Sequence, residues 1–371
     1  MIGDSVIRLA DPAAEYRSLR AQIDTAVGEV LESGAYILGP AVERFEREAA
    51  EWIGSPHAIG VSNGTDALVV ALDALGVGQG EGDEVLVPAF SFMATAGPVV
   101  RVGARPIFVD VDPQSFLATP ERMREAVGPR TRAAIVVHLF GRTASWPSDL
   151  GVPVVEDAAQ AFGAGPTARR AGTLGAFGAV SFFPAKPLGA AGDAGLVLAS
   201  DPDLAARARR LRSHGAVGKN RHAEVGGNYR MDPVQAAILS VKLRSLDGWL
   251  AARQHNADTL RARLADVPEV HLPGQGPEGR HAWAQFVIRA DDRDRLARHL
   301  GSAQIESAVY YPIPLPSQPC FSGLGHAAGE FPGAEEACRT VLAIPVHAML
   351  TADEVERVAC EVRKAYGRTS T

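Results

Sequence analysis

Short apolar runs alternate with amphipathic stretches between about residue 58 and about residue 215 of the chain. The runs are too short for helices and are rich in β-branched residues, so they predict buried strands. The predicted strands are residues 84–88, 106–110, 133–138, 153–156, 179–183 and 195–198. Helical patterns fall between several of them, at residues 64–75, 120–127 and 201–213. This alternation predicts an α/β fold with a mainly parallel sheet covered on both faces, and ligands at the carboxyl ends of the strands.

The pattern changes near Asp232, where a long helix to about Leu264 is predicted. Asp232 is a suitable N-cap, Pro233 suits the first helical position, and Gln235 would complete a capping box. After this helix we expect strands at residues 283–288 and 307–311, and helices at residues 333–342 and 351–366. The sequence therefore predicts an N-terminal segment and large domain over residues 1–245, and a smaller α+β domain over residues 246–371. The long helix at about 232–264 would link the two.

Composition excludes several classes of protein. With 371 residues, 46% of them hydrophobic, the chain can bury a large core. A net charge of −6 and the lack of a Lys/Arg run disfavour a nucleic-acid partner. The three cysteines form no C-x-x-C motif, which indicates free thiols in a reducing cytoplasm and implies no metal site. Without an export signal or a run of about 18 apolar residues, we expect a cytoplasmic protein that does not enter the membrane.

Lys186 is the first candidate for chemistry. It is one of only four lysines, and it stands in the apolar, glycine-bounded run at residues 181–189. Apolar neighbours disfavour the charged ammonium and so favour the neutral amine, which condenses with aldehydes to a Schiff base. The alternative is a surface lysine on a loop rich in proline and glycine. The run alone does not decide between the two.

A phosphate site is the second candidate. Gly64 and Thr65 stand just before an apolar helix, where backbone N–H groups and the helix dipole favour an anion. Ser181, at the end of a predicted strand, offers a hydroxyl to the same phosphate. The simpler alternatives are an ordinary helix cap and an ordinary strand serine. The phosphate interpretation therefore depends on the other candidates.

Asp157 is the third candidate, because it ends a buried strand where an unpaired carboxylate is costly. A protonated pyridine nitrogen would pair with it, and a ring kept cationic can absorb electrons from a substrate carbanion. The alternative is an N-cap for a helix beginning at Ala158. Phe92, after another strand, could stack on the same ring, although a phenylalanine there is more often core. We interpret His138 as structural.

Together these segments resemble the DegT/DnrJ/EryC1/StrS family of PLP-dependent sugar aminotransferases, nearly end to end. The similar segments are residues 62–68, 87–95, 106–112, 156–160, 181–186, 192–195, 227–232, 311–315 and 344–347. The resemblance implies a fold-type I transferase with pyridoxal 5′-phosphate as cofactor. It also implies a homodimer whose active sites lie at the subunit interface.

The resemblance implies a role for each matching residue. Lys186 corresponds to the lysine that forms the Schiff base, and Asp157 to the partner of the pyridine nitrogen. Gln160 would lie at the ring face or at the ring hydroxyl, and Phe92 would stack on the ring. The cofactor phosphate would be held by Gly64, Thr65 and Ser181, together with Asn228 of the partner subunit. Arg230, Tyr310 and Tyr311 would face the substrate. From the residues alone, Asn228 and Arg230 would be a capped turn before the helix at residue 232.

The implied reaction moves an amino group from L-glutamate to a keto sugar on a nucleoside diphosphate, by a ping-pong mechanism in amino-sugar biosynthesis. Lys186 would also move a proton between the substrate α-carbon and the cofactor. The motifs are most similar to members that aminate carbon 3 of a 3-keto hexose. Pro316 and Ala190-Ala191 depart from the family pattern near the expected substrate position. A cyclitol or another carbocyclic ketone is therefore an alternative acceptor.

Two other classes stay open at this point. A PLP-dependent lyase or dehydratase would keep the phosphate site and Asp157 but would not consume the amino group of glutamate. Some relatives with histidine in place of this lysine dehydrate their substrates, so Lys186 favours amino transfer. A PLP-binding regulator would need an added DNA-binding segment, and the sequence contains no basic helix-turn-helix outside the core.

Overall fold

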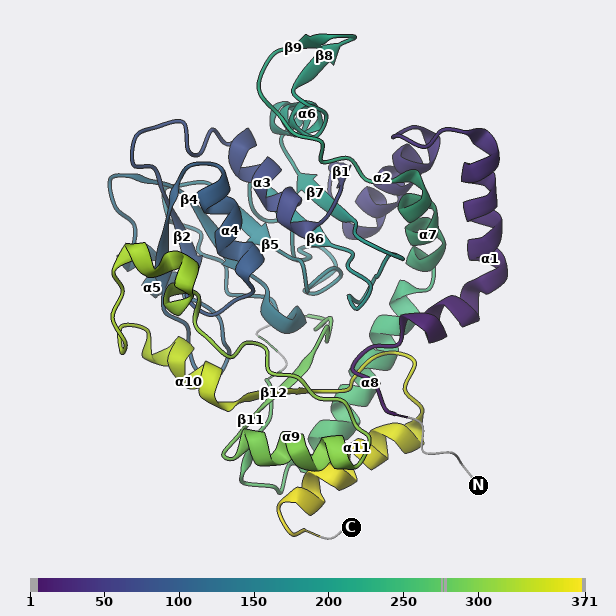
Figure 1. The fold of residues 1–371 in the computed structure, drawn as a ribbon, viewed down its shortest axis with the longest axis vertical. Helices are drawn as coiled ribbons and strands as arrows, with labels where there is room; N and C mark the ends of the chain where they lie inside the picture. The colour runs from purple at the N-terminus through teal and green to yellow at the C-terminus, as the bar shows by residue number, and fades with distance from the viewer. Residues whose placement is uncertain (1–5, 275, 277–278, 369–371) are drawn as a thin grey trace.

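The computed structural model describes residues 6–274, 276 and 279–368. Its large domain is built on a seven-stranded sheet of order β1-β7-β6-β5-β4-β2-β3 (Figure 1). The strands are β1 (His57–Val61), β2 (Glu84–Pro88), β3 (Arg105–Val109), β4 (Thr131–Val137), β5 (Val154–Asp157), β6 (Phe177–Ser181) and β7 (Gly195–Ala199). Neighbours are parallel except at β7, which is antiparallel to both β1 and β6. The predicted mainly parallel sheet is confirmed, and β1 is an additional strand that the pattern did not predict.

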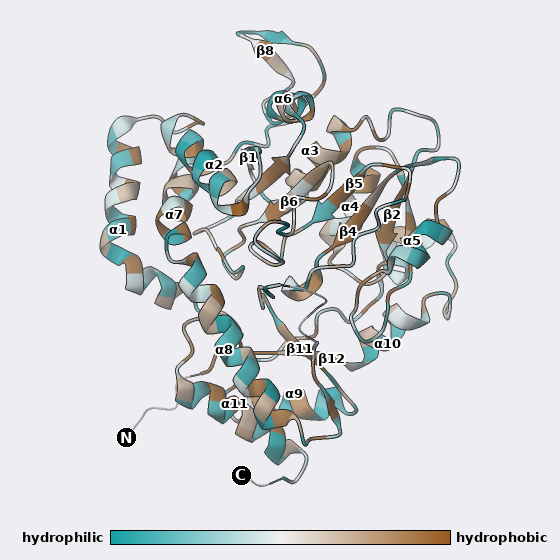
Figure 2. Ribbon diagram, turned by 180° about the vertical axis from the view of Figure 1, so that it is seen from behind, coloured by the Kyte–Doolittle hydropathy of each residue, from teal (hydrophilic) through white to brown (hydrophobic). Residues whose placement is uncertain are grey.

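Helices cover both faces of this sheet, which explains the nearly continuous apolar strands. Residues of α3 (Gly64–Ala74), α4 (Met93–Arg101) and α6 (Pro202–Leu211) share one buried cluster with the sheet. Residues of α2 (Pro40–Ile53) and α7 (Pro233–Leu243) share a second cluster on the other face. The N-terminal α1 (Pro12–Ser33) packs outside α7, and α5 (Pro120–Glu125) contributes Met123 to the first cluster. Seen from behind, the strands are mostly brown and α1 carries much teal, as this layering requires (Figure 2).

The predicted long helix from residue 232 to residue 264 is wrong in one respect, because two helices occupy this stretch. α7 ends at Leu243 and α8 (Leu246–Leu264) begins after a turn at Arg244 and Ser245. α7 packs against α2 and the large sheet, whereas α8 places Leu246 and Leu250 in the same cluster and packs its later turns against the C-terminal helix. A straight helix could not satisfy both surfaces. The predicted capping box is also absent, since Asp232 makes no side-chain cap bond and Gln235 Oε1 accepts the Ala191 N–H instead (2.8 Å).

The smaller domain holds a three-stranded antiparallel sheet of order β10-β11-β12. Its strands are β10 (Val270–His271), β11 (Phe286–Ala290) and β12 (Val341–Ile344), and its helices are α8, α9 (Arg293–Ser302), α10 (Pro332–Thr340) and α11 (Ala352–Ala365). The predicted strand at 307–311 is wrong, because only an isolated bridge joins Ala308 to Ala343 there. Ile7 packs into this domain's core, so the first described residues reach across to it. We keep the proposed boundary at residues 245 and 246, in the turn between α7 and α8.

A small hairpin, β8 (Ala216–Gly218) with β9 (Arg221–His222), extends away from the body beyond α6 (Figure 1). Val217 and Val225 on this segment are exposed. Across the described residues, no helix combines the length and the apolar character that crossing a membrane would require.

Candidate active site

All of the predicted site residues except Asn228 and Arg230 line a cavity of about 740 Å³ at the carboxyl ends of the parallel strands. This is where an α/β sheet is expected to bind ligands. The residues that line it include Gly64, Thr65, Phe92, Asp157, Gln160, Ser181, Lys186, Tyr310 and Tyr311. They come from segments as far apart as residues 64 and 311, so the fold assembles what the sequence spreads over most of the chain.

Asn228 and Arg230 are not among the described residues that line this cavity. Asn228 is exposed and bridges Ser213, and Arg230 bridges Val61 beside the start of α3. The Nε atom of Arg230 is buried and has no hydrogen bond. One chain alone therefore does not bring these two residues together with Lys186.

The start of α3 has the shape of an anion cradle. Asn63 caps the helix by accepting the Asp66 N–H at 2.8 Å, so neither Gly64 nor Thr65 serves as the cap. The N–H groups of Gly64 and Thr65 are then among those that have no partner inside the helix. A Cβ on Gly64 would lie 2.7 Å from the Cβ of Ser181. Only glycine lets the Ser181 hydroxyl approach this helix end.

Gly64→Ala should therefore weaken cofactor binding by about tenfold or more, because Ser181 or the first turn of α3 must shift. Titrating the apo protein with pyridoxal 5′-phosphate measures the change. Gly248→Ala is the matched control, since Gly248 is an exposed position of α8 where an added Cβ would meet open space. Equal affinities for the Gly64→Ala and Gly248→Ala proteins would contradict the cradle.

Asp157 ends β5 and is nearly fully buried. Its Oδ2 accepts the hydroxyl of Thr95 at 2.7 Å, and its Oδ1 accepts the Ala159 N–H at 3.2 Å. Burial raises the pKa of Asp157, although Thr95, Ala159 and the charge of Lys186 each oppose this. No helix begins at Ala158, so the alternative role as an N-cap is excluded. A nearby cation at the cavity would stabilise this carboxylate.

Lys186 lies on a tight loop after β6, and contacts with α7 hold this loop in place. A Cβ on Gly189 would lie 2.3 Å from the carbonyl oxygen of Pro184, so the loop closes only with glycine. Lys242 of α7, itself buried, donates to the Gly189 carbonyl at 2.5 Å and pairs with Glu15 of α1 at 2.6 Å. Two helices therefore fix the loop that carries Lys186.

Burial lowers the pKa of Lys186 to about 8, and the charge of Asp157 only partly opposes this. A lysine with a lowered pKa loses its proton at a lower pH than a free lysine, so more of it is the nucleophilic amine near neutrality.

We expect the rate at which the apo protein captures pyridoxal 5′-phosphate to rise with pH and to level off above about pH 8. The sign follows from the amine, which must be neutral to attack the aldehyde. Stopped-flow absorbance over a pH series measures the rate. A rate that keeps rising as it would for an unperturbed lysine, to about pH 10, would contradict the lowered pKa.

Gln160 and Tyr311 are oriented by each other. Gln160 Oε1 accepts the Phe140 N–H at 2.6 Å, and its Nε2 donates to the Tyr311 hydroxyl at 3.2 Å. The amide of Gln160 can therefore offer only its NH₂ group toward the cavity. Burial raises the pKa of Tyr311, so this phenol acts as a hydrogen-bond donor and not as a base. Phe92 is half-exposed at the cavity, with its ring centroid 5.8 Å from that of Tyr311.

Glu156 and His138 form a buried pair that sequence reasoning did not identify. His138 Nδ1 accepts the Ala144 N–H at 3.0 Å, so its Nε2 carries the proton and donates to Glu156 at 2.8 Å. Glu156 also accepts backbone N–H groups from Gly172, Leu174 and Gly175. Burial alone would raise the pKa of Glu156, but these bonds outweigh it and the pKa lies below its ordinary value. Both ring nitrogens of His138 are thus used within the protein, in line with a structural role.

The residues that depart from the family pattern are not part of the described cavity wall. Ala190 and Pro316 are buried, and Ala191 is exposed and held by Gln235. Their expected position beside the substrate stays a prediction.

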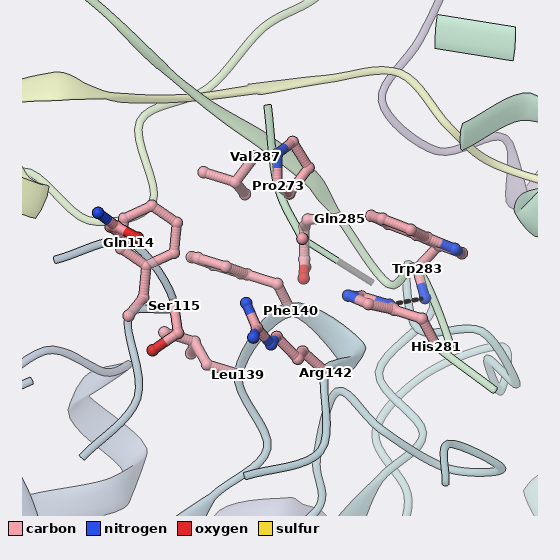
Figure 3. A pocket seen from close by; sticks show the side chains of 12 residues that line it. Gln114, Ser115, Leu139, Phe140, Arg142, Pro273, His281, Trp283, Gln285 and Val287 are labelled. Atoms are coloured by element: carbon pink, nitrogen blue, oxygen red, sulfur yellow. Dashed lines mark hydrogen bonds between the residues drawn. The ribbon is translucent and has the colours of Figure 1, made fainter. Parts of the chain in front are cut away.

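A much smaller cavity lies next to the large one (Figure 3). Leu139 and Gln285 line both, and the figure shows Arg142 extending toward its centre, with His281 stacked under Trp283. Its volume of about 20 Å³ has room for a single water molecule. Burial lowers the pKa of His281 to about 3, so this ring is neutral. The small cavity cannot hold a cofactor.

The large cavity suits pyridoxal 5′-phosphate on three counts. It presents the amine of Lys186 for the aldehyde and a cradle at Gly64 and Ser181 for the phosphate. Its buried Asp157 supplies a carboxylate for a protonated ring nitrogen. The aldehyde, the phosphate and the ring nitrogen of the cofactor each have a matching protein group in this cavity.

Known proteins share this whole architecture. A solved structure, that of Streptomyces venezuelae DesV in complex with a ketimine intermediate, has a TM-score of 0.94 and 38% identity, and covers 98% of this chain and 100% of that one. A dTDP-3-amino-3,4,6-trideoxy-alpha-D-glucose transaminase of Streptomyces venezuelae is 39% identical over 95% of this chain and 94% of its own. A pleiotropic regulatory protein of Geobacillus stearothermophilus is also 39% identical, over 97% of this chain and 98% of its own length.

The family model of the DegT/DnrJ/EryC1/StrS aminotransferase family matches residues 17–363, nearly the whole chain. A solved structure of ntda from Bacillus subtilis, 30% identical over 95% of this chain with a TM-score of 0.86, holds the bound cofactor PMP. The protein belongs to the DegT/DnrJ/EryC1/StrS aminotransferase family and is a PLP-dependent aminotransferase.

Proposed function

We propose that this enzyme transfers the amino group of L-glutamate to a keto sugar linked to a nucleoside diphosphate, with a 3-keto hexose as the first choice. The observation that carries the proposal is the meeting of Lys186, Asp157 and the Gly64 cradle in one cavity of about 740 Å³. A cavity of this size leaves room for a sugar beside a cofactor. The name of the Streptomyces venezuelae transaminase supports an amino group at carbon 3.

Each residue has a definite task in this proposal. Lys186 binds the cofactor and, once displaced by the donor amine, holds and moves the proton of the substrate α-carbon. Asp157 keeps the ring nitrogen protonated, and Gly64, Thr65 and Ser181 hold the phosphate. When bound, the cofactor supplies an electron sink for the carbanion that proton removal creates. Gln160 and Tyr311 donate hydrogen bonds, and Phe92 covers the ring.

We further propose that the active enzyme is a homodimer in which each cavity is completed by the other chain. Among the described lining residues, the side chains that carry a positive charge at neutral pH are Lys186 and Arg101, and Arg101 is paired with Asp66 at 3.3 Å. Glutamate and a nucleoside diphosphate both bring anionic groups that need further cations. The partner subunit would supply Asn228, which would complete the phosphate site, and the nearby Arg230, which would face the substrate. The half-exposed Phe92 and Phe183 leave apolar surface for such a partner.

Complementation tests the shared site. Lys186→Ala and Arg230→Ala chains should each be inactive alone, whereas a mixture refolded together should recover about a quarter of the wild-type rate, because half the dimers are mixed and each has one intact site. No recovery, with mixed dimers verified by differently tagged chains, would place both residues in one subunit's site.

A substrate panel tests the reaction. The holoenzyme is incubated with L-glutamate and with dTDP- or UDP-linked 3-keto and 4-keto hexoses, and 2-oxoglutarate and amino sugar are measured. Equal amounts of both products with a 3-keto hexose are expected. A sugar product formed without 2-oxoglutarate would indicate a lyase or dehydratase, and turnover of a carbocyclic ketone alone would replace the sugar acceptor.

A further inference from the structure

Two hydroxyl groups and one carboxyl group form a buried hydrogen-bonded chain at the wall of the cavity. Ser91 Oγ lies 2.6 Å from Thr95 Oγ1, and Thr95 Oγ1 lies 2.7 Å from Asp157 Oδ2. Thr95 is fully buried and Ser91 is 3% exposed. Ser91 and Asp157 line the cavity, whereas Thr95 is not among the described lining residues. Thr95 therefore contacts Asp157 from the side away from the cofactor position.

When Asp157 is ionised, chemistry sets the direction of these hydrogen bonds. An ionised carboxylate only accepts, so the Thr95 hydroxyl must donate to Asp157. Its single proton is then used, and the Ser91 hydroxyl must donate to Thr95. The chain runs from Ser91 through Thr95 to Asp157, and each donation polarises the next bond. The effect is to favour the charged form of the carboxylate.

The position of Thr95 in its helix makes this contact noteworthy. It is the third residue of α4, and a helical threonine commonly turns its hydroxyl to the carbonyl four residues earlier. Here the hydroxyl instead reaches a strand end 62 positions away in the sequence. The carboxylate of Asp157 also meets the first turn of α4, where the helix dipole favours negative charge.

We infer that Thr95, supported by Ser91, is a positioning residue that keeps Asp157 ionised and aimed at the ring nitrogen of the cofactor. The inference rests on the proposed role of Asp157. Without such donors, a carboxyl group this deeply buried would hold its proton to higher pH and would lose its attraction for a protonated ring. The hydrogen-bonded chain thus offsets the free-energy penalty of placing the charged carboxylate of Asp157 in the core.

Other groups also face Asp157, so the test must separate them. Lys186 faces it across the cavity, Tyr311 and His138 lie close enough to influence it, and Glu156 precedes it on β5. Because both ring nitrogens of His138 are engaged, it supplies no direct bond to Asp157. None of these residues changes in the Thr95 and Ser91 variants. Any shift in the pH dependence of cofactor affinity in those variants is therefore caused by the change in the hydrogen-bonded chain.

The experiment measures the affinity of the apo protein for pyridoxal 5′-phosphate as a function of pH. Thr95→Val keeps the shape and removes the donor, so the dissociation constant at neutral pH should rise about tenfold or more. The pH at which affinity is half-maximal should move upward, and Thr95→Ser should restore both values. Ser91→Ala should act in the same direction with a smaller effect, and it provides the test if Thr95→Val folds poorly. The control is Thr259→Val, at a threonine of α8 whose hydroxyl donates to the His255 carbonyl of its own helix.

A Thr95→Val protein with the wild-type pH midpoint would overturn the inference, and so would one whose affinity falls equally at every pH. Asp157→Asn is measured in parallel. Weak binding by Asp157→Asn beside unchanged binding by Thr95→Val would overturn this inference and leave the proposed function standing. Wild-type binding by Asp157→Asn would overturn the role of Asp157 itself.

Discussion

Lys186→Ala is expected to lower the transamination rate by about 10⁴-fold or more, because covalent binding of the cofactor and proton transfer are lost together. The purified variant should bind pyridoxal 5′-phosphate weakly and should release no 2-oxoglutarate from L-glutamate. Visible absorbance with and without glutamate, together with a 2-oxoglutarate assay, measures both losses.

The matched control for this lysine is Lys364→Ala. Lys364 is exposed on α11 and pairs with Glu361 at 2.7 Å, far along the chain from the cavity. Its rate should equal that of the wild type. Added methylamine should restore part of the rate to Lys186→Ala if the lost group is a base, since a small amine can enter the space. Full activity of Lys186→Ala would remove the basis for every role proposed around the cavity.

Asp157→Ala is expected to lower the rate by about 10²- to 10³-fold, as for other charges aimed at a reacting group. Without the carboxylate the ring nitrogen loses its proton, and the ring becomes a poorer electron sink. Steady-state rates with L-glutamate and the dissociation constant of pyridoxal 5′-phosphate measure the effect.

The loss of activity should not be accompanied by a loss of stability in the apo protein. Burial raises the pKa of Asp157, so its charged form is penalised in the folded apo protein at pH values above that pKa. Asp157→Asn keeps the shape and removes this penalty, so the apo variant should unfold at the same or a higher denaturant concentration than the wild type. An inactive Asp157→Asn that is also clearly destabilised would mean that the carboxylate serves the fold and not the ring.

The large sheet was predictable because its strands are buried on both faces. β2 coincides with the predicted range, and β4 and β7 lie within about two residues of theirs, since their apolar runs are continuous. β1 escaped prediction because it begins with His57 and because Gly60 interrupts its short apolar run. Its strand conformation comes from pairing with β7, a contact far away in the sequence. The segment at 307–311 has the residues of a strand but only one bridge to pair with.

The site was predictable where a residue type carries the chemistry, and not where a role depends on contacts. Lys186 and Asp157 were identified because an apolar lysine and a carboxylate at a strand end each need an explanation. Thr95 lies within the segment matched to the family, yet only its packing against Asp157 gives it a role. Thr95, in the first turn of α4, follows Ser91 by four residues, and this spacing can be seen in the sequence. It becomes informative only once the fold places both residues beside β5.

The anchor of the Lys186 loop has a consequence for biosynthesis. Glu15, Gly189 and Lys242 must all be present before the loop is fixed, and β1 has no strand to pair with until β7 has been made. A ribosome-bound chain that stops short of residue 242 therefore contains the catalytic lysine without its support. Such long-range closure slows folding and leaves an unpaired strand exposed in the meantime. In this enzyme the capacity for catalysis should arise as one late event and not by gradual improvement.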